Sequence, residues 1–313
     1  MNKSHLRLAT RASPLALAQA NAIKQQLTTH YPELKIMLVP MTTHGDQHQN
    51  TSLQDLGGKS LFVKTLQDAL LKDEADFAVH CIKDMSVFPC DKLTLSAISE
   101  RAPANDVLIS TRFCSLDELP KNAVIGTASP RRHCQIKAFR PDCTVALCRG
   151  NINTRLNQLL TNQYDAIILA HAGLLRLGIT QPHIIPLPLE TFIPAIGQGA
   201  LGMECRTDDT QTQAYLSSLH HPDSAICVNA ERLINRQLNG DCHTPIGIHA
   251  TLDNNTLHIH AMIGDIHSNT RLQTSQSGPR NNATQLAEMV SKTLIDLGAL
   301  DLIQKHRQNN QKG

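Results

Sequence analysis

A cysteine in a polar loop is the first candidate for chemistry. Cys242 lies in Asn239-Gly240-Asp241-Cys242-His243-Thr244-Pro245, where glycine and proline predict a loop after a helix. This thiol is therefore more available for reaction than Cys205 or Cys227. Thiolates are strong nucleophiles, so covalent chemistry at Cys242 is expected. The adjacent His243 is weak evidence for a Cys-His dyad, because sequence neighbours rarely form one.

A carboxylate with a cationic neighbour follows a predicted strand. His80-Cys81-Ile82-Lys83-Asp84 ends an apolar run, and ligands of open α/β sheets bind at the carboxyl ends of strands. The positive charge of Lys83 can tune the carboxylate of Asp84. From spacing alone, a surface ion pair explains the two residues equally well.

Basic residues form a third candidate group. They are Arg131, Arg132, Arg140, Arg149 and Arg155, with Arg11, Lys59 and Lys83 elsewhere. The planar guanidinium suits carboxylates. Arg131-Arg132 and Arg149-Gly150-Asn151 both fall at predicted strand-to-helix junctions, which favours a ligand with several carboxylates or phosphates over a solvated basic face. His44 and His48 have the spacing of a helical metal pair, but Gly45 and Asp46 favour a loop, and no metal site is predicted.

Alternating strands and helices must position these residues. In the first part, strands are predicted at residues 6–8, 34–39 (closed by Pro40) and 76–80, with helices from Ser13-Pro14 and through 62–70. After a loop at 101–106, strands are predicted at 124–126, 144–148 and 164–170, with helices from Ser129-Pro130 and over 153–160. This order predicts α/β structure with largely parallel sheets.

Two predicted helix starts are alike. Thr10-Arg11-Ala12-Ser13-Pro14 and Thr127-Ala128-Ser129-Pro130 each place a hydroxyl cap and a nearby arginine at a helix N-terminus. Free N–H groups and the helix dipole favour anions there. Two similar lobes that face each other would make a cleft lined by such helix starts, but the likeness alone is weak evidence, since Ser-Pro begins many helices.

The last third has a different pattern. Prolines between 182 and 194 predict a hinge-like crossing, and a new unit begins near Asp223 with a helix through 230–238. Residues 257–263 alternate as a strand, residues 286–297 carry the apolar stripe of a last helix, and the tail after Lys305 is predicted to be frayed.

Bulk composition excludes several protein classes. A chain of 313 residues suits two or three domains, and 41% hydrophobic with 18% charged residues is typical of a soluble globular protein. The net charge of +2 argues against a dedicated nucleic-acid binder. No apolar run marks a signal peptide or approaches the roughly 18 residues of a membrane span. Nine scattered cysteines without a Cys-x-x-Cys pair predict reduced thiols in a cytoplasmic protein without structural zinc.

Six segments in order resemble the porphobilinogen deaminase (hydroxymethylbilane synthase) family over nearly the whole chain. They are residues 10–17 (TRASPLAL), 57–64 (GGKSLFVK), 78–84 (AVHCIKD), 149–156 (RGNINTRL), 194–201 (PAIGQGAL) and the loop around Cys242. The resemblance implies an α/β fold of three domains: residues 1–99 with 200–218, residues 100–199, and residues 219–313. The first two would resemble the lobes of type II periplasmic binding proteins, and the third would be a small α+β domain that carries the cysteine.

The resemblance also implies an activity and a cofactor. The family is a transferase of porphyrin and heme biosynthesis that deaminates four porphobilinogen molecules and joins them head to tail into hydroxymethylbilane, releasing ammonia. Cys242 would hold a dipyrromethane primer through a thioether. Asp84 would be the catalytic carboxylate, because one carboxylate can stabilise the cationic intermediates and assist proton transfer.

Further site residues, a location and a partner follow from the resemblance. The implied cofactor-binding residues are Asp84, Lys83, Arg131, Arg132, Ser13, Thr127 and Ser129, and the implied substrate-binding residues are Arg11, Arg149, Arg155, Lys59 and Gln19. A cytoplasmic monomer is expected, which passes its product to uroporphyrinogen-III synthase and binds neither nucleic acid nor membrane.

Three positions depart from the family's pattern, and two other functions stay open. Cys81 stands where the family usually has Ser, Pro130 where Leu is common, and Asp241 where a second Gly is usual, so any positive φ there is harder to adopt. A two-lobed anionic-solute-binding protein would share the fold but would need no Cys242. A cysteine hydrolase would need a separate activating histidine, which the sequence does not identify.

Overall fold

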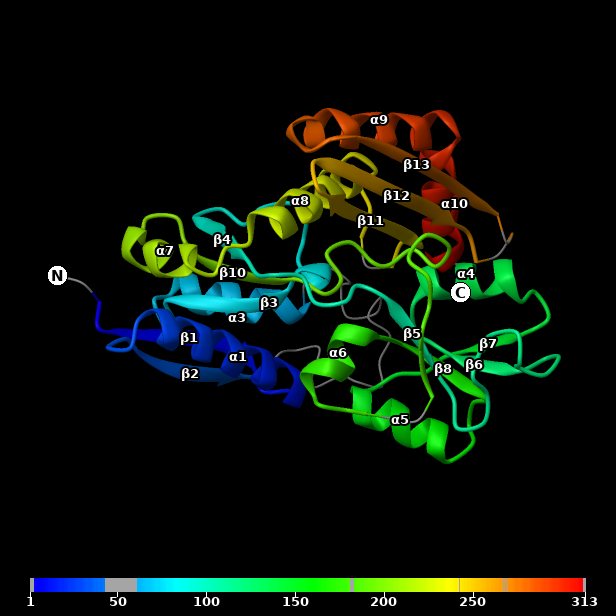
Figure 1. Cartoon of the computed structure of the whole chain (residues 1–313), viewed down its shortest axis with the longest axis horizontal. Coiled ribbons are helices and arrows are strands. Elements are labelled where there is room, and N and C mark those ends of the chain that lie inside the picture. The colour runs from blue at the N-terminus through cyan, green and yellow to red at the C-terminus, as the bar shows by residue number, and fades with distance from the viewer. Residues whose placement is uncertain are drawn as a thin grey trace. The chain divides into compact units, whose positions relative to one another are not determined.

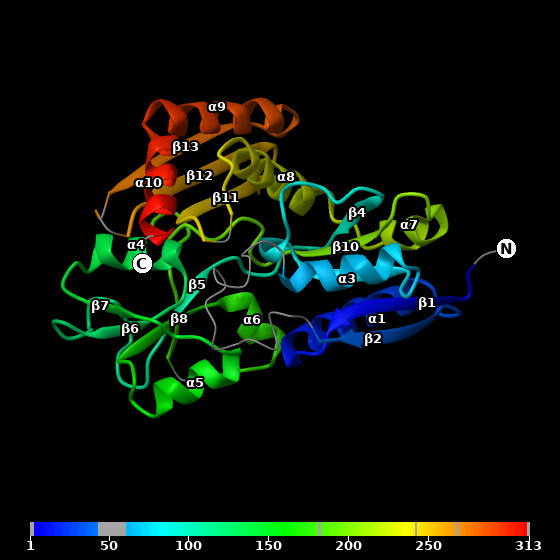
Figure 2. The same ribbon diagram turned by 180° about the vertical axis from the view of Figure 1, so that it is seen from behind.

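The structure is a computed structural model that describes residues 3–42, 61–180, 183–241, 243–266, 268 and 270–311. The chain divides into two compact units, Met1–Ala102 with Gly199–Ala225, and Pro103–Gln198 with Ile226–Gly313. Figures 1 and 2 show the helices and strands of the two units from opposite sides. The three-domain boundaries expected from the sequence stay a prediction.

The first unit is built on a five-stranded sheet in the order β2-β1-β3-β10-β4. The strands are β1 (His5–Arg11), β2 (Lys35–Met41), β3 (Phe77–Cys81), β4 (Leu93–Ile98) and β10 (Leu201–Arg206), and the helices are α1 (Pro14–His30), α3 (Leu61–Leu71), α7 (Thr210–Ser217) and the 3₁₀ turn η1 (Ile82–Asp84). Leu6 and Leu8 pack with α1 and α7 on one face, while Ala9 packs with α3 on the other. This alternation along β1 places helices on both faces of the sheet.

Local sequence explains where these elements begin and end. Ser13 caps α1 by accepting a hydrogen bond from the N–H of Ala16 at 3.4 Å, and Pro14 takes the first helical position, as predicted. The prediction that Pro40 closes the second strand is wrong, because β2 runs through it to Met41. β2 lies at the edge of the sheet, where a residue without an N–H group is tolerated.

The second unit contains a similar sheet in the order β7-β6-β8-β5-β9. Its strands are β5 (Asp106–Ile109), β6 (Val124–Gly126), β7 (Thr144–Ala146), β8 (Ala166–Ala170) and β9 (Ile184–Pro186), and its helices are α4 (Pro130–Phe139), α5 (Ile152–Leu160) and α6 (His171–Arg176). Ile136 of α4 packs on one face of the sheet, and Leu159 of α5 packs on the other.

The expectation of largely parallel sheets needs correction, because both five-stranded sheets are mixed. The strand pairs β1–β2, β1–β3, β6–β7 and β6–β8 are parallel. The pairs of β10 with β3 and β4, and of β5 with β8 and β9, are antiparallel. Parallel neighbours along the chain are joined by a crossover connection, usually a helix. β5 and β10 are instead the first strands after the chain changes unit, at 102/103 and 198/199, and these two strands are the ones that pair antiparallel.

The rest of the second unit is a smaller α+β layer. The antiparallel sheet β11-β12-β13 consists of Ile246–Asp253, Thr256–Gly264 and Arg271–Pro279. Its helices are α8 (Pro222–Gln237, which begins in the first unit), η2 (Arg280–Asn282), α9 (Ala283–Asp296) and α10 (Ala299–Gln311). The prediction of a frayed tail after Lys305 is therefore wrong, since α10 continues through it. The expected α/β class with a small α+β part is confirmed.

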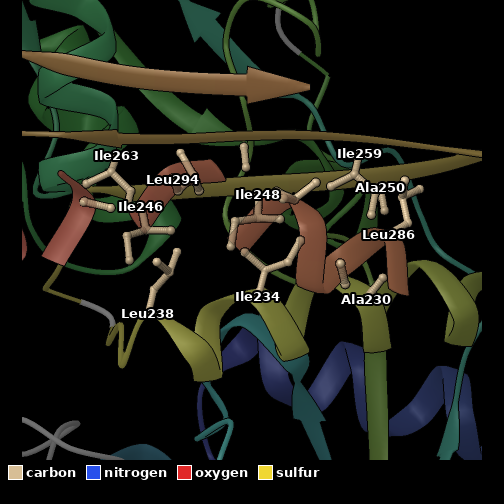
Figure 3. Packing of buried hydrophobic residues seen from close by; sticks show 14 of the residues in the cluster. Ala230, Ile234, Leu238, Ile246, Ile248, Ala250, Ile259, Ile263, Leu286 and Leu294 are labelled. Atoms are coloured by element: carbon tan, nitrogen blue, oxygen red, sulfur yellow. The ribbon is translucent and has the colours of Figure 1, made fainter. Parts of the chain in front are cut away.

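An aliphatic core holds this smaller layer together (Figure 3). Ile234 of α8, Ile248 of β11 and Leu294 of α9 are all fully buried and point toward one another. Each such side chain contributes about 1.5–3 kcal/mol on burial. Ala299 and Ile303 of α10 belong to the same cluster, which attaches the last helix to the sheet.

Candidate active site

In the first unit, the predicted residues lie at one edge of the sheet. β1 and β3 run parallel, with Leu8 opposite Phe77, so Arg11 and the residues after Cys81 follow strands that end at the same edge. Ser13, at the N-terminus of α1, comes two residues after Arg11, the last residue of β1. The structure therefore places Arg11, Ser13, Lys83 and Asp84 at the same edge of this sheet, as expected for the carboxyl ends of parallel strands.

Asp84 is presented on a short, anchored turn. It closes η1, in which the buried Ile82 donates its backbone N–H to the Ala200 carbonyl at 3.2 Å, and Met85 donates back to Ile82 at 3.0 Å. Lys83 is half-buried, whereas Asp84 is exposed. A fixed backbone with an exposed carboxylate is suitable for acid–base or electrostatic catalysis.

Gln19 lies beneath this edge and contacts Cys81. Its side chain is buried on α1, with Nε2 3.2 Å from Cys81 Sγ and Oε1 3.5 Å from the same sulfur. The thiol at the position where the family usually has Ser is thus hydrogen-bonded within the unit. The role of Gln19 toward substrate stays a prediction.

In the second unit, Ser129 caps α4 as Ser13 caps α1. Ser129 Oγ accepts from the N–H of Arg132 at 3.4 Å, and Thr127 Oγ1 accepts from the N–H of Ser129 at 3.2 Å. Pro130 takes the first helical position, where proline is favoured, so its departure from the family's Leu is structurally harmless. The predicted likeness of the two helix starts is confirmed.

Arg131 and Arg132 share one buried carboxylate. Arg132 donates to Asp106 Oδ1 from Nε at 3.1 Å and from Nη2 at 2.7 Å, while Arg131 Nη1 lies 2.7 Å from Asp106 Oδ2. All three residues are buried: Arg132 is 6% exposed, Arg131 is 4% exposed and Asp106 is 0% exposed. Asp106 thereby fixes the orientation of both guanidinium groups.

The electrostatics of this triad keep Asp106 ionised. Burial opposes ionisation, but the charges of Arg131 and Arg132 outweigh it and hold the pKa of Asp106 far below its usual range. Burial is also the main reason that the pKa of Arg131 is lowered. Gln198 Nε2 donates to Asp106 Oδ1 at 3.0 Å and to the Ala104 carbonyl at 2.7 Å.

Arg149 and Arg155 extend the cationic group beside α5. Arg155 Nε donates to the Gly150 carbonyl at 2.8 Å. Burial lowers the pKa of Arg155, and the positive charges of Arg132 and Arg149 lower it further. Like charges that disfavour one another in this way are stabilised when an anion is bound among them.

The donor set is suitable for a group rich in carboxylates. Ser129 and Thr127 lie at a helix start, and the guanidinium groups belong to residues on α4, on α5 and just before α5. The charge of Arg155 interacts with those of Arg132 and Arg149. Acetate and propionate side chains, as a dipyrromethane carries them, match guanidinium and hydroxyl donors in charge and geometry. Two predicted site residues, Cys242 and Lys59, lie outside the described residues, as do His44 and His48.

Comparisons with known proteins decide the family. The model of "porphobilinogen deaminase, dipyromethane cofactor binding domain" matches residues 6–214, and that of "porphobilinogen deaminase, C-terminal domain" matches residues 225–296. Porphobilinogen deaminases from Coxiella burnetii, strains Dugway 5J108-111 and RSA 493 / Nine Mile phase I, are each 44% identical over 98% of this chain and 100% of their own length. The chain belongs to the porphobilinogen deaminase family.

A solved structure gives a more distant likeness. The periplasmic VFT2 domain of Bordetella pertussis BvgS is 14% identical, with a TM-score of 0.40 over 69% of this chain and 86% of that domain. The porphobilinogen deaminase matches over nearly the whole chain do not favour the alternative of a solute-binding protein. Among the described residues, no helix has the length and apolarity to cross a membrane.

Sequence reasoning missed one residue of the cationic site. Asp106 stands in a run of turn formers, residues 101–106, that predicts a loop, yet it begins β5 and is fully buried. The signal that could have found it is its position before the apolar run Val107–Ile109, because a carboxylate beside a buried strand needs a cationic partner.

Proposed function

We propose that this chain is a hydroxymethylbilane synthase, which deaminates four porphobilinogen molecules and joins them head to tail on a covalently bound dipyrromethane. The observation that carries the proposal is the 44% identity to porphobilinogen deaminases over the whole length of those relatives. The structure supports it with an exposed carboxylate, Asp84, on one sheet edge of the first unit, and with a cationic group on the second unit.

Asp84 is proposed to be the catalytic carboxylate. Loss of ammonia from the aminomethyl group of porphobilinogen leaves a positively charged species, and a nearby carboxylate lowers the free energy of that charge. The same carboxylate can accept the proton that leaves the pyrrole after each bond forms. Lys83 and Arg11, at the same edge, are proposed to bind carboxylates of the cofactor and the incoming substrate.

Cys242 is proposed to carry the dipyrromethane through a thioether. When bound, this group supplies the pyrrole carbon to which the first substrate unit is joined. Arg131 and Arg132 would hold its carboxylates together with Ser13, Thr127 and Ser129, while Arg149, Arg155, Lys59 and Gln19 would bind the incoming porphobilinogen. We also propose that the protein is a cytoplasmic monomer of three domains that passes its product to uroporphyrinogen-III synthase.

Intact-mass measurement and an activity assay test the proposal together. Purified full-length protein is expected to exceed its sequence mass by one dipyrromethane and to convert porphobilinogen to a linear tetrapyrrole. Cys242→Ser should lack both the added mass and the colour with Ehrlich's aldehyde reagent, while Cys114→Ser, a matched change at an exposed cysteine, should keep them. Active wild-type protein with the mass of the bare chain would rule out the tethered cofactor.

A further inference from the structure

The C-terminal helix contacts the cysteine loop on both sides of position 242. From α10, Arg307 Nη2 donates a hydrogen bond to the Asn239 carbonyl and lies 3.6 Å from Asp241 Oδ2. The Nε2 atom of His306, the preceding residue, lies 3.1 Å from the His243 carbonyl oxygen. Since a carbonyl only accepts, Nε2 carries the hydrogen. Two consecutive residues of α10 thus bind backbone before and after Cys242.

Asp241 organises the loop from within. Its Oδ1 accepts hydrogen bonds from the N–H of His243 at 3.0 Å and from the N–H and Oγ1 of Thr244 at 3.0 and 2.8 Å. Burial opposes its ionisation, but the Thr244 and His243 hydrogen bonds and the charge of Arg307 leave its pKa lowered. Among the described residues of this loop, Asn239 has a positive φ, at 51°, and Asp241 does not. Asp241 therefore acts as a turn cap and as the ionic partner of α10.

His306 is itself held in place. Its side chain is 1% exposed, and Nδ1 lies 4.0 Å from Oδ1 of the fully buried Asp265. The other oxygen of Asp265 accepts from Ser268, at 3.2 Å from the N–H and 2.6 Å from Oγ. Ile303, one turn earlier, packs in the core of the small layer. The contact with the His243 carbonyl is therefore anchored to β12 and the turn that follows it.

We propose that α10 is a positioning element for the reactive cysteine, in which His306 and Arg307 fix the backbone on the two sides of Cys242. Contacts at Asn239 and Asp241 before position 242, and at His243 after it, restrict the backbone of the loop that holds the cysteine. This inference rests on the proposed function for its purpose, but the contacts define a testable effect on the loop itself. A merely structural role of α10 predicts lower stability with no selective change at residues 239–244.

Hydrogen exchange and thiol alkylation of the full-length chain test this inference. The variants are Arg307→Gln, Arg307→Lys and His306→Gln, with Lys305→Ala as the control at an exposed position of the same helix. Exchange is followed by mass spectrometry in the peptide around Cys242 and in β11 and β12. Alkylation of Cys242 by iodoacetamide is followed in protein produced without porphobilinogen.

Arg307→Gln is expected to accelerate exchange of the Cys242 peptide about tenfold, because the loop opens locally, while exchange of β11 and β12 stays unchanged. The alkylation rate of Cys242 should change in the same variant, and Arg307→Lys should restore part of both effects. Unchanged loop exchange and alkylation in Arg307→Gln would overturn the inference, and so would equal changes in Lys305→Ala. Because Arg307 is 38% exposed, this variant decides the question even where His306→Gln fails to fold.

The failure of this inference is distinguishable from failure of the proposed function. Wild-type protein without a dipyrromethane mass would contradict the proposed function, yet the exchange and alkylation measurements would still report whether α10 fixes the loop. With the cofactor present, a positioning role predicts slower cofactor loading and lower kcat in Arg307→Gln, with the same KM for porphobilinogen.

Discussion

Arg132 forms a two-pronged hydrogen bond to one oxygen of Asp106, with Nε at 3.1 Å and Nη2 at 2.7 Å, and both side chains are buried. The other oxygen of Asp106 lies 2.7 Å from Arg131. The two arginines that are proposed to bind the cofactor thus have a buried anionic partner inside their own unit. A site prepared in this way has little conformational entropy to lose when carboxylates bind.

Asp106→Asn should therefore destabilise the second unit strongly. The amide keeps the size of the side chain but removes the charge that compensates two buried guanidinium groups. Breaking a buried ion pair by removing one partner costs about 3–5 kcal/mol. Thermal and urea unfolding of the full-length protein measure this cost. The ion pair of the exposed Arg112 with the partly buried Asp165 provides the control, since Arg112→Leu should change the free energy of unfolding by about 1 kcal/mol or less. An equally small effect of Asp106→Asn would contradict the ionised triad.

Asp84→Asn should leave the fold intact and nearly abolish turnover. The carboxylate is exposed, so its loss costs little stability, while general acid–base catalysis contributes about 10²–10⁴-fold to a rate. Asp84→Glu should retain more activity, because the charge survives at a shifted position. Steady-state kinetics with porphobilinogen check both variants. Asp84→Asn within a few-fold of wild type would reduce Asp84 to an ion-pair partner.

The sequence predicted the elements that carry the site better than the contacts within it. Ser13 and Ser129 were identified as caps because a hydroxyl before proline has a local meaning. Asp106 and the helix α10 cannot be identified in this way. The burial of Asp106 depends on arginines some 25 residues later, and residues 304–311 lack an apolar stripe, so α10 depends on tertiary contacts such as that of His306 with the His243 carbonyl.

The arginines should divide by the stage that they serve. Arg131→Leu and Arg132→Leu should impair assembly of the cofactor and give protein with the mass of the bare chain, because both lie beside Ser129 on α4. Arg149→Leu and Arg155→Leu should carry the cofactor but stall during elongation, and leave bound intermediates. Native gels and intact masses after incubation with porphobilinogen separate the two outcomes. Uniform weak effects across all four variants would favour a solvated basic face.

Acid should weaken the first unit through two carboxylates, the buried Asp76 and the partly buried Asp209. Burial opposes ionisation of Asp76, but contacts with Arg7 and Lys3 leave its pKa lowered, and contacts with Lys3 and Thr212 likewise lower the pKa of Asp209. A carboxylate whose pKa is lower in the folded protein stabilises it above the unfolded value, near 3.9, and this contribution is lost as the pH falls through the folded value.

Asp76→Asn should therefore flatten the loss of stability below about pH 4, because it removes one group that must be protonated. Urea unfolding between neutral and acidic pH measures the difference. Asp91→Asn, an exposed change in the same unit, is the control and should leave the slope unchanged. A wild-type slope in Asp76→Asn would show that Asp76 contributes nothing to the acid response.

Cys81→Ser should be folded, loaded with cofactor and at least as active as wild type. The thiol is half-buried and contacts both polar atoms of Gln19, at 3.2 and 3.5 Å, so a hydroxyl in its place can donate and accept at the same side chain. A hydroxyl is the stronger donor, and one neutral hydrogen bond is worth about 0.5–1.5 kcal/mol, which is small beside the arginine contacts.

Alkylation of Cys81 in protein without cofactor should block loading, because the added bulk occupies the edge that carries Lys83 and Asp84, and bound cofactor should protect the thiol. Cys90→Ser is the matched control, since burial raises the pKa of Cys90 and its thiolate is correspondingly scarce. Mass mapping of the alkylated residue and kinetics with porphobilinogen give the result. An inactive Cys81→Ser, with fold and cofactor intact, would mean that the thiol has a role of its own.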